Sequence, residues 1–136
     1  MSAEEIHDGG CLCGAVRYRA HGLPTQVNHC HCRMCQRASG APVVTWATFP
    51  ADRVEWTTGT PARRRSSEIA ERGFCASCGS ALLWQEDARK ELIDITAGTL
   101  DRPEAIRPED HIFTESAVPW LRMDDGLPRY RRSRKD

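Results

Sequence analysis

The chain has 136 residues, and its 19 basic and 19 acidic side chains cancel to a net charge of zero. Val, Ile, Leu and Phe supply only 23 residues, so the aliphatic core should be thin, but the balanced charge and the 40% hydrophobic content exclude the composition of a disordered chain. The length fits a single domain over residues 1–136. The neutral balance also argues against a general nucleic-acid binder, which usually carries a basic excess.

Short β-type stretches recur between turn signals along the whole chain. Strands are predicted at residues 15–20, 26–30, 43–49, 54–58, 67–74, 82–84, 92–97 and 112–114. The main helix signal is residues 33–39, closed by Gly40 as a C-terminal cap, and four prolines interrupt the last third of the chain. The pattern predicts a mainly β fold of antiparallel sheets with little helix, in which Trp46, Trp56, Trp84 and Trp120 add bulk to the core.

The N-terminal residues and the most apolar run of the chain indicate where in the cell the protein is expected. Residues 1–10 are acidic and lack the apolar stretch of a secretory signal. The most apolar run, residues 41–50, is about half the roughly 20 residues that a membrane-spanning helix requires. We therefore expect a cytoplasmic protein with no membrane partner. Basic residues cluster at 63–65, interpreted as a solvated strand edge, and residues 129–136 are interpreted as a basic, flexible tail.

All seven cysteines fall into three closely spaced groups. These are Cys11 and Cys13 (C-x-C), Cys30, Cys32 and Cys35 (C-x-C-x-x-C), and Cys75 and Cys78 (C-x-x-C). Such spacing lets neighbouring sulfurs converge on one ion at about 2.3 Å. Disulfides are rare in the cytosol, and an odd number would leave one cysteine over. The cysteines are therefore predicted to bind metal.

The C-x-x-C group has the form of a zinc knuckle, because Gly79 after the second cysteine can take the positive φ that such a turn needs. Two knuckle thiolates supply half of a tetrahedral zinc site, and Cys11 and Cys13 can supply the other half. Gly9, Gly10 and Gly14 are expected to let the backbone bend around them. Because this pairing closes a long loop, losing its metal should unfold the domain.

Three cysteines then remain, Cys30, Cys32 and Cys35. Three protein ligands with one open position are typical of catalytic zinc, whereas structural sites close with four. Two alternatives stay open. Cys32 and Cys35 could join the knuckle in a zinc-ribbon-like site, which strands the other three cysteines. The triplet could also be a structural site completed by His29 or His31, although strand alternation points both histidines away from Cys30 and Cys32.

Three segments resemble the glutathione-dependent formaldehyde-activating enzyme family, which includes the domain of centromere protein V. They are residues 9–18 (GGCLCGAVRY), 30–42 (CHCRMCQRASGAP) and 74–80 (FCASCGS), with further matches at 95–101, 111–113 and 119–120. The resemblance implies a β-tent fold, a structural zinc at the four paired cysteines and a second zinc at the triplet. It also implies condensation of formaldehyde with glutathione to S-(hydroxymethyl)glutathione, a carbon–sulfur lyase activity. The ending, residues 111–130, is more similar to short bacterial members.

A zinc held by three thiolates can acidify an incoming thiol or polarise an aldehyde oxygen. We therefore predict the triplet as the reactive centre, with the more labile of two zincs, and with a small thiol such as glutathione and a small aldehyde as substrates. The neighbouring polar side chains are candidates for substrate binding: Arg33 and Arg37 for a carboxylate, Gln36 and Ser39 as hydrogen-bond donors, and His111 as acid or base. Each has a plainer interpretation, as surface charge, local capping or a structural histidine.

Two other classes of function fit the same cysteines. One is a non-catalytic binding module stabilised by zinc, and the other is a thiol-based redox or metal-handling protein. A basic surface patch would favour the module, and exposed thiols of low pKa without stable metal would favour the third class. The open metal position favours the enzyme.

Overall fold

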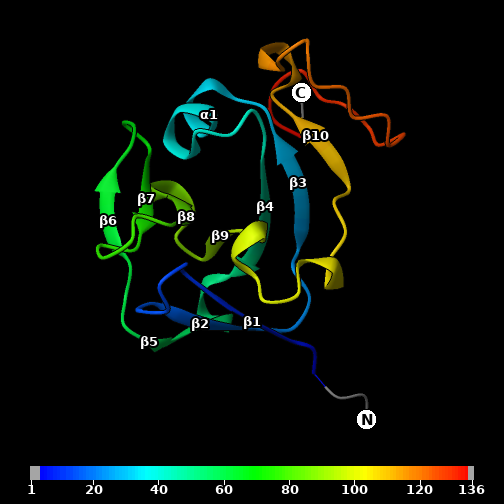
Figure 1. The fold of residues 1–136 in the computed structure, drawn as a ribbon. Coiled ribbons are helices and arrows are strands. Elements are labelled where there is room, and N and C mark those ends of the chain that lie inside the picture. Colours follow the sequence, from blue (N-terminus) through cyan, green and yellow to red (C-terminus); the bar gives the residue numbers. More distant parts are fainter. Residues whose placement is uncertain (1–3, 135–136) are drawn as a thin grey trace.

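The computed structural model describes residues 4–134 and consists mainly of β-strands (Figure 1). The smaller of its two sheets has the order β1-β2-β5 and is antiparallel throughout. Its strands are β1 (Ile6–Gly10), β2 (Arg17–His21) and β5 (Val54–Thr58). In Figure 1 this sheet lies at the end of the molecule nearest the N-terminus.

The larger sheet has seven strands in the order β10-β3-β4-β9-β8-β7-β6. They are β3 (Gln26–Cys30), β4 (Val44–Pro50), β6 (Ala62–Arg65), β7 (Ala70–Phe74), β8 (Ala81–Glu86), β9 (Leu92–Thr96) and β10 (Asp110–Ile112). Neighbouring strands are antiparallel except β10, which runs parallel to β3. The helix α1 (Arg33–Ser39) connects β3 to β4 and lies at the end opposite the small sheet (Figure 1).

The mainly β prediction is confirmed, and α1 has the predicted bounds. Gly40 caps it at φ 76°, and its backbone N–H donates to the Gln36 carbonyl. The sequence analysis did not predict two of the observed strands, β1 and β6. β1 reads IHDGG and β6 reads ARRR, so neither carries the β-branched or aromatic residues that mark a strand. Short 3-10 helices occur at Ala51–Arg53, Asp87–Arg89, Ala97–Thr99, Pro103–Ala105 and Thr114–Ser116.

Among the described residues, two hydrophobic clusters make up the core, and cysteines belong to both. The larger is built around Tyr18, Phe49, Leu82, Leu83 and Ile95, and it includes two cysteines, Cys11 and Cys75. The smaller joins Cys30 and Cys35 to Val44 and Trp46. Cysteines thus occupy positions that aliphatic residues would otherwise fill. Trp120 is 73% exposed, so its predicted place in the core is wrong.

After β10, which is its last strand, the chain turns back and runs beside that strand. The backbone N–H of Tyr130 donates to the His111 carbonyl at 2.8 Å, and that of Phe113 donates to the Arg132 carbonyl at 2.8 Å. Arg134 pairs with Asp110 at 2.9 Å. Residues 129–134 of the expected tail are therefore tied to the sheet, and residues 135–136 lie outside the described range. Among the described residues, no helix has the length and apolar character needed to cross a bilayer.

Candidate metal centres and an adjacent cavity

Four cysteines from two distant turns meet at one point, as the spacing predicts. Cys11 and Cys13 follow β1, whereas Cys75 and Cys78 occupy the turn between β7 and β8. The Sγ atoms of all four lie within 4.8 Å of one another. Two neighbouring pairs are closer, with Cys11 Sγ to Cys13 Sγ at 3.7 Å and Cys13 Sγ to Cys75 Sγ at 3.8 Å.

This spacing fits a tetrahedral metal. Four sulfurs placed about 2.3 Å from a central zinc stand about 3.8 Å apart. Backbone N–H groups also face the sulfurs, because Val16 donates to Cys11 Sγ at 3.3 Å and Cys78 donates to Cys75 Sγ at 3.5 Å. Thiolates accept such bonds, so the cluster has the donor set and the surroundings of a closed metal site. These four residues could hold a metal ion, which we call the four-cysteine centre.

The turns around this centre use glycine in two different ways. Gly14 and Gly79 both have φ +82°, the left-handed region that the tight turns require. Gly9 and Gly10 are instead regular strand residues, which differs from their predicted role. A Cβ on Gly9 would lie 2.4 Å from Tyr18 Oη, and one on Gly10 would lie 2.5 Å from the Val16 carbonyl oxygen. These two glycines are needed for space, not for bending.

The remaining three cysteines form a second cluster where β3 passes into α1. Cys30 ends β3, Cys32 is the N-cap of α1, and Cys35 lies in the first turn of that helix. Their Sγ atoms lie within 4.8 Å of one another, with Cys30 Sγ to Cys35 Sγ at 3.5 Å. Cys30 and Cys35 are buried, whereas Cys32 is half-buried. The rival partition is not adopted, since Cys75 and Cys78 belong to the other centre.

The electrostatics of this three-cysteine centre favour negative charge on one sulfur, that of Cys35. Hydrogen bonds to Cys32 and Cys35 raise the pKa of Cys30. The hydrogen bond to Cys30 acts to lower the pKa of Cys32, but its hydrogen bond to Cys35 and its burial outweigh that effect and raise the pKa. Hydrogen bonds from the thiols of Cys30 and Cys32, followed by the guanidinium of Arg72, lower the pKa of Cys35 well below that of an ordinary thiol. Arg72 Nη2 lies 3.5 Å from Cys35 Sγ. The same guanidinium lies over the Trp46 ring, 5.9 Å from its centroid. Three thiol groups, one of which is favoured as a thiolate, could hold a cation.

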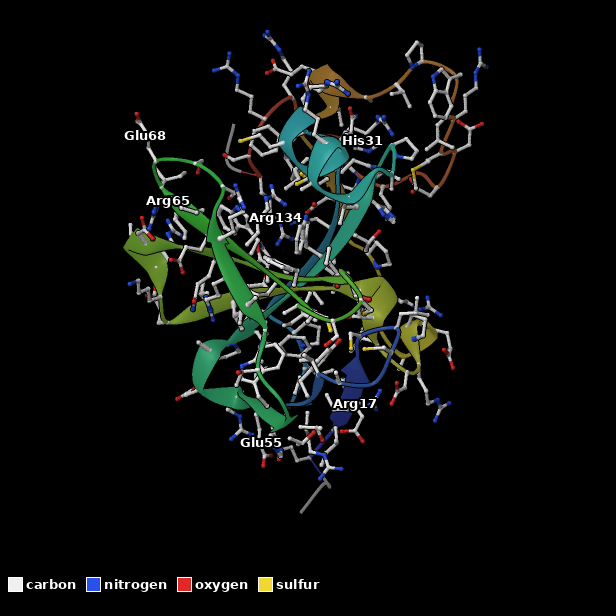
Figure 2. The ribbon with its side chains drawn as sticks, turned by 60° about the vertical axis from the view of Figure 1, so that its left-hand side comes forward. Arg17, His31, Glu55, Arg65, Glu68 and Arg134 are labelled. Carbon is white, nitrogen blue, oxygen red and sulfur yellow. The ribbon has the colours of Figure 1, made fainter. Side chains whose placement is uncertain are left out.

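A cavity of about 520 Å³ borders this centre. Cys35 is the cysteine of the triplet that lines it, and four arginines share its wall: Arg37, Arg64, Arg65 and Arg72. Arg64 of β6 stands directly opposite Arg72 of β7 in the sheet register. Figure 2 shows Arg65 on this strand and His31 in the same half of the molecule, away from Arg17 and Glu55 over the small sheet. The cavity therefore suits a ligand that carries negative charge.

The predicted substrate-binding residues do not all lie at the same cavity. Arg37 and Ser39 line the cavity, although the Ser39 hydroxyl also donates to the Cys35 carbonyl at 2.8 Å. Arg33 lines a shallower hollow of about 230 Å³ beside Trp120. Gln36 is buried, and its side-chain amide donates to the carbonyls of His31, Pro42 and Ser116. Its amide nitrogen is thus committed to holding α1 against neighbouring loops.

His111 does not line the cavity beside Cys35. It is fully buried, with its Nδ1 at 2.9 Å from His31 Nε2 and its Nε2 at 2.8 Å from an Asp125 carboxylate oxygen. Its ring centroid lies 4.9 Å from that of His29. Burial lowers the pKa of His29 and lowers that of His31 to about 4, so both are neutral at neutral pH. The rings of His29 and His31 both lie against the His111 ring, which agrees with the alternation that predicts one face for them.

Sequence reasoning missed the arginines that β6 and β7 bring to the cavity. The run Arg63 to Arg65 has the pattern of a solvated strand edge, and Arg72 stands three residues before the knuckle cysteine with no partner visible in the sequence. A basic run next to a predicted strand that leads into a metal ligand was the available signal. The contact of Arg72 with α1 could not be read from this signal, because Arg72 and Cys35 are 37 residues apart in the sequence.

The fold and site define a class: a β-sheet protein with a closed four-cysteine centre and a three-cysteine centre that opens on a cavity. The family model of the glutathione-dependent formaldehyde-activating enzyme matches residues 6–116. A Halomonas elongata protein named as a candidate enzyme of that kind is 31% identical over 127 residues, which cover 86% of this chain and 80% of the relative. The chain belongs to the glutathione-dependent formaldehyde-activating enzyme family.

Two further proteins are similar to this chain. An uncharacterised lyase of Schizosaccharomyces pombe is 29% identical over 76 residues, 56% of this chain and 55% of that protein. The crystal structure of a Rhodobacter sphaeroides protein superposes with a TM-score of 0.58, covers 90% of this chain and 98% of its own, and is 19% identical. At that identity the match supports the fold alone.

Proposed function

We propose that the protein is a zinc-dependent carbon–sulfur lyase that forms and cleaves the adduct of a thiol with a small aldehyde, as in S-(hydroxymethyl)glutathione synthase. The observation that carries this proposal is the three-cysteine centre, placed at the wall of an arginine-lined cavity. Membership of the family supports glutathione and formaldehyde as the substrates to test first. The structural zinc belongs at the four-cysteine centre and the reactive zinc at Cys30, Cys32 and Cys35.

The proposed reaction needs no oxidant or reductant. The thiol sulfur forms a bond to the carbonyl carbon, the π electron pair of the carbonyl moves to oxygen, and that oxygen takes the proton the thiol gave up. Cleavage is the reverse. Zinc at the open centre would supply Lewis acidity, which lowers the pKa of the thiol or polarises the aldehyde. The rest of the work is binding and orientation, which fall to the chain.

The cavity residues can perform this binding. Arginines at its wall would pair with the carboxylates of a thiol such as glutathione, because guanidinium and carboxylate match as bidentate partners. Arg72 contacts both Cys35 Sγ and the Trp46 ring. A carboxylate drawn to the arginines would bring the attached thiol toward Cys35. The volume of about 520 Å³ lies in the range of small-molecule sites.

The test compares wild-type protein with Cys32→Ser and with Leu12→Ser. Zinc per chain is measured by elemental mass spectrometry, and adduct formation and cleavage are followed by NMR exchange between free and adducted glutathione, with the uncatalysed rate subtracted. We expect a clear rate enhancement in the wild type, and one zinc fewer per chain, a retained fold and lost enhancement in Cys32→Ser. Leu12 is 90% exposed between two cysteines of the other centre, so its variant should behave as wild type.

Full activity in Cys32→Ser would overturn the assignment of the triplet as the reactive centre. Zinc at both cysteine centres and an intact fold, with no rate enhancement for glutathione or other small thiols, would instead indicate a non-catalytic module stabilised by zinc.

A further inference from the structure

Beyond the two cysteine centres, three nitrogen and oxygen ligands meet near the C-terminal end of the fold. One ring nitrogen each from His29 and His111 and one carboxylate oxygen of Asp125 all lie within 4.8 Å of one another. They come from β3, from β10 and from the loop that follows residue 120. We propose that these residues form a third metal site, for a divalent transition-metal ion that prefers nitrogen and oxygen ligands.

The hydrogen-bond partners of the two imidazoles are compatible with the tautomers that a metal needs. His29 Nδ1 lies 2.7 Å from Thr45 Oγ1, so it can donate to that oxygen and leave the lone pair of Nε2 for a metal. His111 Nδ1 lies 2.9 Å from His31 Nε2, so His111 can donate there and turn its own Nε2 toward Asp125. Metal-binding histidines almost always donate their second ring N–H in this way, which orients the ring.

The distances between His111 and Asp125 also suit a shared ion. Nε2 of His111 lies 2.8 and 3.1 Å from the two carboxylate oxygens. Ligands held about 2.1 Å from an ion and at right angles to each other stand about 3.0 Å apart. The Asp125 carboxylate is further fixed by the Leu127 backbone N–H, which donates to Oδ1 at 3.1 Å. Two imidazole nitrogens and one carboxylate oxygen make up the donor set of this site.

The site is separate from the three-cysteine centre and can be reached from solvent. His29 and Cys30 are adjacent in β3, so their side chains point to opposite faces of the strand. His111 is fully buried, whereas the Asp125 side chain is 31% exposed. An ion would enter on the Asp125 side and join the loop around residue 125 to β3 and β10. Two histidines and a carboxylate with open positions are a known donor set for zinc and for ferrous iron.

Zinc is a stringent probe for this site, since a nitrogen and oxygen site generally binds zinc more tightly than ferrous or manganous ions. Protein with its cysteine centres already loaded is dialysed against a small excess of zinc chloride, and zinc per chain is counted. We expect the wild type to hold one zinc more than Asp125→Asn or His29→Gln. The matched control is Asp124→Asn, which changes the neighbouring exposed carboxylate and should hold as much zinc as the wild type.

The comparison is a difference between variants, so it does not depend on how many ions the cysteine centres hold or on whether the protein is an enzyme. A second measurement is independent of counting: histidine-ring NMR should show zinc shifting the Nε2 signals of His29 and His111. The proposal is overturned if Asp125→Asn retains the additional zinc, if the wild type takes up none, or if only His7 or His21 responds.

Discussion

Arg72 donates a hydrogen bond to Cys35 Sγ at 3.5 Å, across 37 residues of chain. This contact ties the β6–β7 hairpin to the three-cysteine centre at the start of α1. The same guanidinium faces the cavity and lies over the Trp46 ring. One side chain thus stabilises negative charge on a candidate metal ligand and presents positive charge to a ligand in the cavity. We infer that Arg72 positions both the Cys35 sulfur and the substrate in the cavity. Its removal should therefore lower the reaction rate and the substrate affinity together.

Replacing Arg72 by Met removes the charge and keeps most of the aliphatic bulk. A hydrogen bond to a charged group contributes about 1.5–3 kcal/mol, so we expect kcat/KM for adduct formation to fall about ten- to hundredfold, with zinc content unchanged. Arg63→Met is the control, because Arg63 bonds Gln85 on the protein surface at 2.8 Å and does not line the cavity. Equal kcat/KM in Arg72→Met and Arg63→Met would contradict the inferred role.

The two cysteine centres should differ in what their loss does to stability. Cys13 and Cys75 are 62 residues apart, so a metal at the four-cysteine centre closes a long loop and contributes directly to folding. We expect Cys78→Ser, or a strong chelator, to abolish the cooperative thermal transition seen by circular dichroism. Cys32→Ser should keep that transition with a modest decrease in Tm. A Cys78→Ser protein that folds as the wild type does would show that apolar packing suffices.

Much of this architecture could be predicted because it depends on local sequence patterns. The bounds of β3, β5 and α1 follow from alternation and from the Gly40 cap, and the three local groups of cysteines follow directly from their spacing. These features depend on residues close together in the sequence, where geometry restricts the possibilities.

What escaped prediction depends on contacts between distant segments. β6 is a strand because it pairs with β7, not because Arg favours strands. Arg64 and Arg72 become cavity residues through that pairing, and Asp125 meets His111 because the chain turns back along β10. Trp120 carries a hydrophobic side chain yet stands exposed. In each case the residue type is compatible with several roles, and the position of the residue in the tertiary structure decides which role it has.

The place of Gly9 against Tyr18 gives a test of packing that is independent of metal. The two residues pair across β1 and β2, and a Cβ at Gly9 would lie 2.4 Å from Tyr18 Oη and 2.6 Å from the Thr99 carbonyl oxygen. Tyr18 is buried and bonded to Thr99 Oγ1 at 2.8 Å, so it cannot move freely. Gly9→Ala should lower the free energy of unfolding by about 1–3 kcal/mol, measured by urea denaturation.

Gly98→Ala is the control for this change. No atom lies within 4 Å of a Cβ built there, so the free energy of unfolding should change little. If both variants lost stability equally, the loss would reflect backbone flexibility in general and not the close approach of Tyr18.

Asp94 should make stability fall as pH rises through the weakly acidic range. Burial raises the pKa of this β9 carboxyl to about 6 from an unfolded value of 3.8, although Thr48 donates a hydrogen bond to it. Between those values the folded protein binds more protons than the unfolded chain, and stability decreases with pH wherever that holds. The carboxyl's contribution is therefore most favourable below 3.8, and the full cost of ionising it is present above about 6.

Asp94→Asn removes this titration and can keep the Thr48 hydrogen bond through its side-chain oxygen. We expect the variant to be more stable than the wild type by roughly 2–3 kcal/mol at neutral pH, since each pKa unit corresponds to about 1.4 kcal/mol. The difference should shrink as pH falls toward 4. Urea denaturation of both proteins at several pH values measures it, and loss of metal at low pH affects both alike. A constant difference across this range would mean that the Asp94 carboxyl titrates in the folded protein as it does in the unfolded chain.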